Sequence, residues 1–159
     1  MKKTYVISAF PACGKTYAFK NYQHKYSILD SDSSEFSWIK DENGNNTNER
    51  NANFPQNYIE YIKSNIGKVD IIFVSSHLIV RQALKDAGIR YCTVYPKENM
   101  LNEWVGRMYR RGNDEKFISF IIDNWDKFMH DIIFNEPYGT GLWRLGNEEY
   151  IDIDYLCGW

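Results

Sequence analysis

Short apolar runs alternate with longer segments of helical periodicity along the chain. Residues 4–8, 26–30 and 91–95 are rich in strand formers, and residues 70–76 contain an uninterrupted apolar run bounded by polar residues. Such a run indicates a strand that is buried on both faces of a parallel sheet. The alternating pattern at residues 150–154 predicts a last strand.

Helices are predicted between these strands. Apolar residues recur at helical spacing in the segments 15–22, 54–66, 77–87, 97–111 and 114–134. The alternation predicts an α/β fold of three layers, in which helices cover both faces of a mostly parallel sheet of about five strands.

One segment interrupts this alternation. Residues 41–53 are polar and without period, so we expect a flexible loop there, which is either an insertion that covers a substrate or a solvated surface loop. No internal repeat is present, and the length of 159 residues suits a single domain over residues 1–159.

Composition narrows the possible partners. The formal net charge is −2, which excludes a strongly basic nucleic-acid-binding surface as the default. The three cysteines, Cys13, Cys92 and Cys157, lack the paired spacing of a zinc site and favour a reducing compartment. No apolar run reaches the length of a membrane span, so we expect a cytoplasmic protein without a membrane partner. Oligomeric state is not predicted by the sequence.

The most specific motif follows the first predicted strand. It runs Ala9-Phe10-Pro11-Ala12-Cys13-Gly14-Lys15-Thr16 and matches the pattern G-x-x-x-x-G-K-[ST] at every fixed position except the first, where alanine replaces glycine. A strand before it and a helix after it are the context in which this pattern binds nucleotide phosphates. Ala9 fits if its φ is negative and is strained if the loop requires a positive φ.

Each residue of this loop has a distinct expected role. The backbone N–H groups of Ala12, Cys13 and Gly14 would bind the phosphates of ATP, and Lys15 would reach the β- and γ-phosphates. The Thr16 hydroxyl would hold Mg²⁺. We expect Cys13 to be structural, although a helix N-terminus can activate a thiol.

Two carboxylates follow the second predicted strand. Asp30 and Asp32 should emerge at the same sheet edge as the loop, because ligands in open α/β sheets bind beyond the carboxyl ends of strands. Asp30 could orient Mg²⁺ and bind substrate, while Asp32 could bind or deprotonate an acceptor hydroxyl. The alternative is that both serve a turn and a helix cap.

A basic cluster lies late in the chain. Arg107 has the spacing to share a helix face with Arg110 or with Arg111, so these arginines could point together at phosphates and stabilise transferred charge, and Gly112 offers a hinge. A solvated helix end is the alternative, since cations suit the carboxyl end of a helix.

With these residues, the chain resembles P-loop kinases of the nucleoside monophosphate kinase type, especially the small nucleotide-kinase-like proteins of bacteriophages and their hosts. The resemblance implies the P-loop NTPase fold and a helical lid, here residues 97–112, whose arginines contact the transferred phosphoryl group. It also implies an arginine after the central strand that holds the acceptor phosphate, for which Arg81 is the nearest match.

The sequence departs from this family at the end of the central strand. The Asp-Gly pair of adenylate kinases is replaced by Ser75-Ser76, so Asp30 or Asp32 would have to supply the carboxylate that orients the metal. The Asp-x-Asp motif is similar to that of small-metabolite kinases of the shikimate kinase type. His77 could be a base, a phosphate contact or a helix cap.

Three functions remain open at this stage. The first is ATP-dependent transfer of the γ-phosphoryl group to a nucleoside monophosphate or its deoxy form. The second is a kinase for a hydroxyl acceptor, either a small metabolite or a polynucleotide 5′ end, which is the only nucleic acid we expect. The third is a nucleotide-binding switch without catalysis, which the replacement of glycine by Ala9 would permit.

Overall fold

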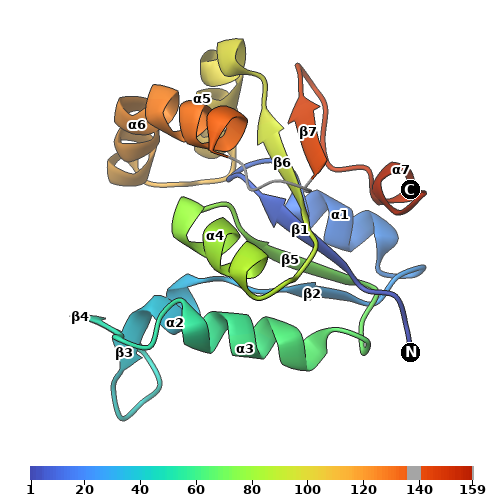
Figure 1. Ribbon diagram of the computed structural model, residues 1–159. Coiled ribbons are helices and arrows are strands. Elements are labelled where there is room, and N and C mark those ends of the chain that lie inside the picture. The colour runs from blue at the N-terminus through green and yellow to red at the C-terminus, as the bar shows by residue number, and fades with distance from the viewer. Residues whose placement is uncertain (136–140, 159) are drawn as a thin grey trace.

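A sheet of five parallel strands organises the chain (Figure 1). The computed structural model describes residues 1–135 and 141–158. The sheet order is β2-β5-β1-β6-β7, and every neighbouring pair is parallel. The strands are β1 (Tyr5–Ala9), β2 (Ile28–Asp30), β5 (Ile71–Ser75), β6 (Cys92–Pro96) and β7 (Gly141–Leu145). The expectation of a mostly parallel sheet of about five strands is therefore confirmed.

Seven α-helices are present in the part of the chain that the structure describes. They are α1 (Lys15–Tyr22), α2 (Ser34–Ser37), α3 (Gln56–Asn65), α4 (Leu78–Asp86), α5 (Leu101–Arg110), α6 (Glu115–Phe134) and α7 (Ile153–Cys157), and a 3₁₀ turn, η1 (Glu98–Met100), precedes α5.

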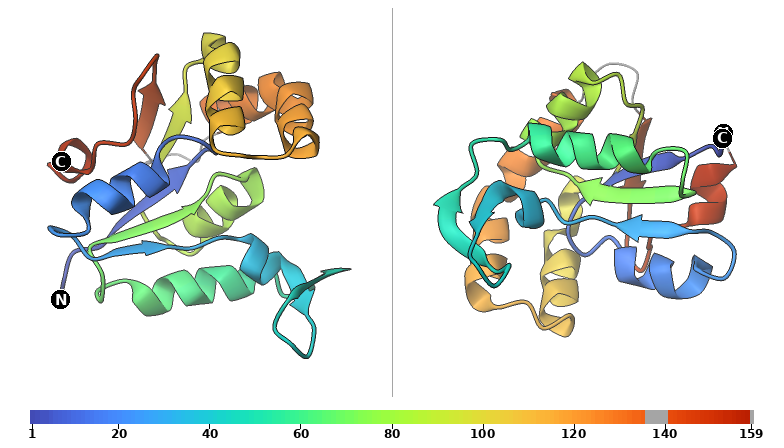
Figure 2. Two further views of the ribbon diagram at one scale, coloured as in Figure 1. Left: turned by 180° about the vertical axis from the view of Figure 1, so that it is seen from behind. Right: turned by 90° about the horizontal axis from the view of Figure 1, so that it is seen from below.

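The alternation of strand residues gives each face of the sheet its own core. Ile71 and Phe73 of β5 pack in a cluster with residues of α1, α5, α6 and α7, whereas Ile72 and Val74 pack with residues of α3 and α4. This follows from the strand period of two, which sends successive side chains to opposite faces. Figure 2 shows α1 and α4 on opposite sides of the sheet.

Helices α5 and α6 lie beyond the carboxyl ends of the strands (Figure 1). The N-cap of α6 is Asp114, whose side chain accepts the N–H of Phe117 at 2.7 Å. Trp104 and Met108 on α5 are fully buried in the cluster beside α1, so the predicted lid segment 97–112 packs in the core along one face.

Two predicted elements are corrected by the structure. Residues 41–53 do not form a simple loop, because β3 (Trp38–Lys40) and β4 (Asn46–Arg50) pair as an antiparallel hairpin. Asp41 closes the turn by accepting the N–H groups of Asn43 and Asn45, and Gly44 adopts φ +80°. The hairpin has no continuous apolar face, so its sequence carries little strand periodicity.

The last predicted strand, residues 150–154, is also wrong. The fifth strand is β7, and Ile151 and Ile153 are instead buried beside the phosphate-loop candidate and at the start of α7. Asp152 caps α7 by accepting the N–H of Tyr155. Burial of alternate isoleucines therefore produced a strand-like pattern without a strand. No helix among the described residues is both long and apolar enough to cross a membrane.

Candidate functional site

The phosphate-loop candidate connects β1 to α1 at the carboxyl edge of the sheet. Ala9 is the last residue of β1 and pairs with Ser75 and Val94 on the two neighbouring strands. It has no positive φ, so alanine fits there. The left-handed positions are Ala12 (φ 61°) and Gly14 (φ 100°). The loop therefore turns three residues before Lys15 and again directly before it.

Lys15 and Asp30 meet at this edge, as the sequence predicts. Lys15 Nζ lies 3.6 Å from Asp30 Oδ1, and both side chains keep contact with solvent. The parallel pairing of β2 and β5, and of β5 and β1, brings the ends of these strands to one side. Lys15, which could bind a phosphate, therefore lies next to the Asp30 carboxylate, which could bind a cation.

Cys13 is a packing residue in this loop. Its Sγ contacts the carbonyl oxygen of Val94 at 3.7 Å, and the side chain is buried. Burial raises the pKa of the thiol to about 12, against the opposing influence of Arg107 and Lys15. The thiol stays protonated at neutral pH, which agrees with the structural role expected for it.

Arg107 lies inside the protein, behind the loop. Its Nη1 donates to the Ala12 carbonyl at 3.2 Å, its Nη2 donates to the Glu149 carbonyl at 2.7 Å, and its Nε donates to Glu103 Oε1 at 3.2 Å. The guanidinium also lies over the rings of Trp104 and Tyr150, 4.0 and 4.3 Å from their centroids. These contacts make Arg107 a residue that positions the loop.

The three arginines of the predicted cluster thus have different surroundings. The Arg107 side chain is 3% exposed, whereas Arg110 is 65% exposed and lies 4.0 Å from Glu103. Arg111 is close enough that its charge favours the ionised form of Cys13. The prediction that these arginines point together at phosphates is not met by Arg107, because its planar group is enclosed between two aromatic rings.

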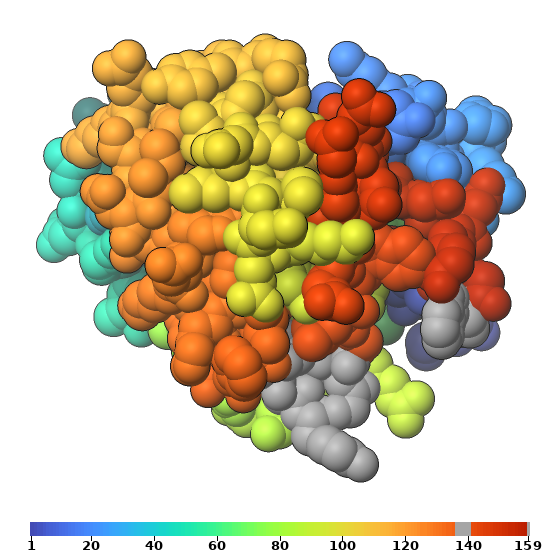
Figure 3. All heavy atoms as spheres, turned by 90° about the horizontal axis from the view of Figure 1, so that it is seen from above, coloured from blue at the N-terminus to red at the C-terminus, as the bar shows by residue number. Residues whose placement is uncertain are grey.

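The segment 149–151 was not expected at the site. The Ile151 N–H donates to the Cys13 carbonyl at 3.0 Å, and the Tyr150 ring stacks on Tyr17 with 5.3 Å between centroids. A Cβ at Gly14 would lie 2.9 Å from Tyr150 Cδ1. Figure 3 shows this C-terminal part of the chain between α5 and α1. No sequence motif marks the contact, which pairs residues far apart in the chain.

A cleft of about 1130 Å³ opens beside the loop. One wall is α6, the opposite wall is α2 with the hairpin and Phe54, and the floor is the start of α4 with Phe10 and Pro11. Lys15 and Thr16 do not line this cleft, so a phosphate held by the loop would lie at its border. Its charged or titratable lining residues are Asp32, Arg50, His77, Arg81, Asp86, Lys127 and Asp131.

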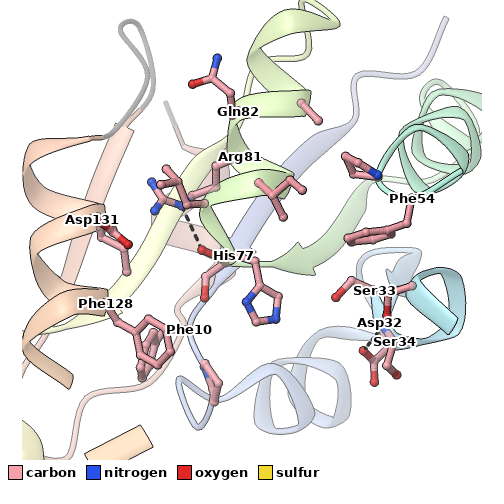
Figure 4. Close-up of a pocket in the computed structure, with 18 of the residues that line it drawn as sticks. Phe10, Asp32, Ser33, Ser34, Phe54, His77, Arg81, Gln82, Phe128 and Asp131 are labelled. Carbon is pink, nitrogen blue, oxygen red and sulfur yellow. Dashed lines mark hydrogen bonds between the residues drawn. The ribbon is translucent and has the colours of Figure 1, made fainter. Parts of the chain in front are cut away.

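Three sequence candidates meet in this cleft (Figure 4). Asp32 caps the turn into α2, since its Oδ1 accepts the N–H of Ser34 at 2.9 Å. Arg81 is 1% exposed, and its Nε donates to the Ser76 carbonyl at 3.0 Å. His77 precedes α4 and reaches solvent through the cleft.

The surroundings of His77 set its protonation state. Desolvation between the cleft walls lowers its pKa, the nearby Asp32 carboxylate opposes this, and the charges of Arg50 and Arg81 lower it further. The imidazole is therefore neutral at pH 7 and can accept a proton from a bound group.

Tyr58 on α3 ties together the two strand ends that carry these residues. Its hydroxyl donates to the Ser31 carbonyl at 2.9 Å and accepts the N–H of Ser75 at 3.4 Å. Burial raises the pKa of this hydroxyl to about 12. The sequence indicated only a helical apolar position, because tyrosine at such spacing is typical of a core residue.

Oxygen atoms that could hold Mg²⁺ gather at the same edge. Thr16 follows Lys15 at the start of α1, Asp30 lies beside Lys15, and Ser75 Oγ is buried without a hydrogen-bond partner among the described residues. Hard oxygen ligands suit Mg²⁺, which keeps several waters and phosphate oxygens. The described residues contain no cluster of three or more histidine, cysteine, aspartate or glutamate side chains that could hold a metal by themselves.

Comparison with known proteins gives no relative from which a function could be transferred. No protein-family model matches the sequence, and the search of curated proteins finds no significant match.

Proposed function

We propose that the chain is an ATP-dependent phosphotransferase that moves the γ-phosphoryl group to a nucleoside monophosphate or its deoxy form. The observation that carries the proposal is the position of the Lys15–Asp30 pair, at the border of a cleft whose floor contains His77 and Arg81. A donor triphosphate on the loop and an acceptor phosphate in the cleft would then be neighbours, as in-line transfer requires.

The fold supports this proposal. The loop after β1 lies where the chain order of the sheet reverses, since the connection after β1 leads to β2 and the connection after β5 leads to β6 on the other side of β1. Ligands of open α/β sheets bind at such a point. This topology is compatible with the P-loop NTPase fold, and our proposal that the chain is of the nucleoside monophosphate kinase type rests on the loop and the cleft together.

Each side chain has a role in this mechanism. The backbone N–H groups of the loop and Lys15 bind the ATP phosphates, and Arg81 holds the acceptor phosphate at the floor of the cleft. Arg110 and Arg111, next to the Gly112 turn at the end of α5, are the arginines that stabilise charge on the transferred group. Arg107 positions the loop.

Mg²⁺ would be held by Thr16 and, through water, by Asp30, with the Ser75 hydroxyl as a further oxygen at this edge. When bound, it would neutralise charge on the β- and γ-phosphates. All three cysteines are free, which suits a reducing cytoplasm.

Incubation with ATP, Mg²⁺ and a panel of nucleoside and deoxynucleoside monophosphates tests the proposal. We expect a nucleoside diphosphate product, detected by ³¹P NMR, and formation of that product on the order of 100-fold more slowly by the Lys15→Met variant. Tight ATP binding with no product from any acceptor would contradict it and favour a nucleotide-binding switch.

A hydroxyl acceptor is the second candidate, because the Asp32 carboxylate lines the cleft and could deprotonate an alcohol. The Asp32→Asn variant distinguishes a hydroxyl acceptor from a nucleoside monophosphate acceptor. If ATP binding survives and all transfer is lost, Asp32 is the base of a hydroxyl kinase. Retained transfer to a monophosphate, whose acceptor oxygen is already ionised, supports the first candidate.

A further inference from the structure

The β3–β4 hairpin contains an arginine, Arg50, that forms no ion pair with any described residue. Arg50 is exposed and lines the cleft, and no carboxylate of the described residues lies within ion-pair distance of it. Its guanidinium lies over the ring of Trp38, 4.0 Å from the centroid. Trp38 and Arg50 are register partners in the hairpin, so the strand pairing itself sets this stack.

This pair lies on the hairpin wall of the cleft, whereas Arg81 lies on the floor. Figure 1 shows the hairpin beyond the end of β2. Residues of the hairpin and of α6 both line the cleft. An acceptor phosphate must lie next to the loop for in-line transfer. The rest of the acceptor, including its base, is therefore directed toward the wall that contains Trp38, Arg50 and Phe54.

The stacked guanidinium of Arg50 favours a base edge that presents two acceptors. Arginine offers several N–H donors in a planar fork and no acceptor. Guanine presents two acceptors, O6 and N7, on one edge, whereas adenine presents one acceptor and one donor there, cytosine presents a donor, and thymine presents one acceptor beside a methyl group. On this edge, guanine alone can pair with both arms of the fork. Cytosine has another adjacent pair of acceptors, N3 and O2, but it offers only a single ring to the aromatic side chains of this wall.

From this geometry we infer that Trp38 and Arg50 read the base of the acceptor, and that the acceptor is a guanine nucleotide. The inference rests on the proposed function, because that function places the acceptor in the cleft. Phe54 supplies an aromatic face for the base. The hydroxyls of Ser34 and Ser37, on the same wall, can accept the N–H groups of the opposite edge of guanine.

Calorimetric binding of GMP, 7-deaza-GMP and AMP tests the inference, with the donor loop first saturated with Mg²⁺ and a non-hydrolysable ATP analogue. We expect GMP to bind about tenfold or more tightly than AMP, and 7-deaza-GMP, which lacks N7, to lose most of that difference. Arg50→Lys keeps the charge but not the fork, so its GMP and AMP affinities should come within about twofold.

Arg90→Lys is the matched control, an exposed arginine next to β6 at the other end of the sheet, and it should keep the preference of the wild type. Equal wild-type affinity for GMP and AMP, binding of neither, or an equal loss of both in Arg50→Lys would overturn the inference. The last result would make Arg50 a phosphate contact. Selective GMP binding without phosphotransfer would overturn the proposed function alone, and equal phosphorylation of all bases would overturn this inference alone.

Discussion

The loop before α1 and the cleft beside it are built in opposite ways. The loop is fixed from behind, because Arg107, Ile151 and Val94 contact its backbone or its buried thiol. The cleft walls instead present side chains with few partners, such as Arg50, which stacks only on Trp38 among the contacts described. Substitutions of the residues that hold the loop from behind should therefore affect folding, whereas substitutions in the cleft should affect ligand choice.

This difference matches what each part has to do in a phosphotransferase. A triphosphate is the same for every acceptor, so its cradle benefits from one rigid arrangement that is prepared before binding. The acceptor determines specificity, and its site must exchange water for ligand contacts. The four predictions below test whether the two regions are as separate as the contacts indicate.

Replacement of Arg107 by alanine should have the largest effect. It removes a donor from the Ala12 and Glu149 carbonyls and from the Glu103 carboxylate, and it empties the space of a side chain that is only 3% exposed. We expect the free energy of unfolding in urea to fall by about 3–5 kcal/mol. Arg110→Ala, which removes an exposed side chain from the same helix, should change it by less than about 1 kcal/mol.

ATP affinity and turnover should fall together in Arg107→Ala, because the loop loses its support. A variant that folds with full stability and binds ATP normally but turns over slowly would instead place Arg107 on the transferred phosphoryl group.

Lys15→Met should separate function from stability. Lys15 is partly exposed and its pair with Asp30 contributes at most about 1 kcal/mol to folding. The loss of a charge aimed at the phosphates should lower kcat/KM on the order of 100-fold. Thermal melting of the ligand-free variant measures the change in stability, and steady-state kinetics measure kcat/KM. A large drop in the melting temperature would show that the loop side chains also support the fold.

Gly14→Ala and Gly44→Ala compare the two regions at the level of the backbone. Both glycines have positive φ, which costs alanine about 1–2 kcal/mol. Only Gly14 meets a neighbour, Tyr150, whereas nothing lies within 4 Å of a Cβ at Gly44 in the hairpin turn. Gly14→Ala should therefore destabilise the protein more than Gly44→Ala.

Adding Tyr150→Gly to Gly14→Ala isolates the steric part of this effect. The double variant should cost less than the sum of its two single changes, because the clash between the new Cβ and the Tyr150 ring is present only in the Gly14→Ala single variant. Additive losses in urea denaturation would mean that Tyr150 does not press on Gly14.

The sequence predicted the parts of the molecule that local patterns determine. The buried run 70–76 became β5, an inner strand of the sheet although the central one is β1, and the pattern ending in Gly14-Lys15-Thr16 follows β1 and leads into α1 as expected. Asp30 was placed correctly beside Lys15 because parallel strands end at one edge. These inferences need only strand period, helix period and the direction of the chain.

The rest depends on contacts between residues that are distant in the chain. Nothing near Arg107 in sequence shows that its guanidinium would be enclosed by Tyr150, and a helical row of arginines looks the same whether it is solvated or buried. The hairpin was missed because polar strands that pair only with each other lack an apolar face. The role of Tyr58 depends on two strand ends meeting, which no local pattern encodes.

Titration of His77 should have the smallest effect on stability of the four predictions, and it probes the cleft directly. Its pKa lies below the ordinary value of 6.5 in the folded chain, so the unfolded chain binds a proton first as the pH falls. The contribution of His77 to stability is therefore complete above pH 6.5 and declines as the pH falls through its lowered pKa. NMR titration of the imidazole resonances measures this pKa, with His24 and His130, which lie outside the cleft, as internal references.

The charged groups around His77 determine the direction in which each variant should shift its pKa. Asp32→Asn removes the carboxylate that favours the imidazolium and should lower the pKa further, whereas Arg50→Gln removes an opposing cation and should raise it. A phosphate bound at the floor of the cleft adds negative charge and should also raise it, so GMP should move the midpoint upward. If neither substitution moved the titration, the hairpin and α2 would not lie close to His77 in solution, and the cleft would be wider than its contacts indicate.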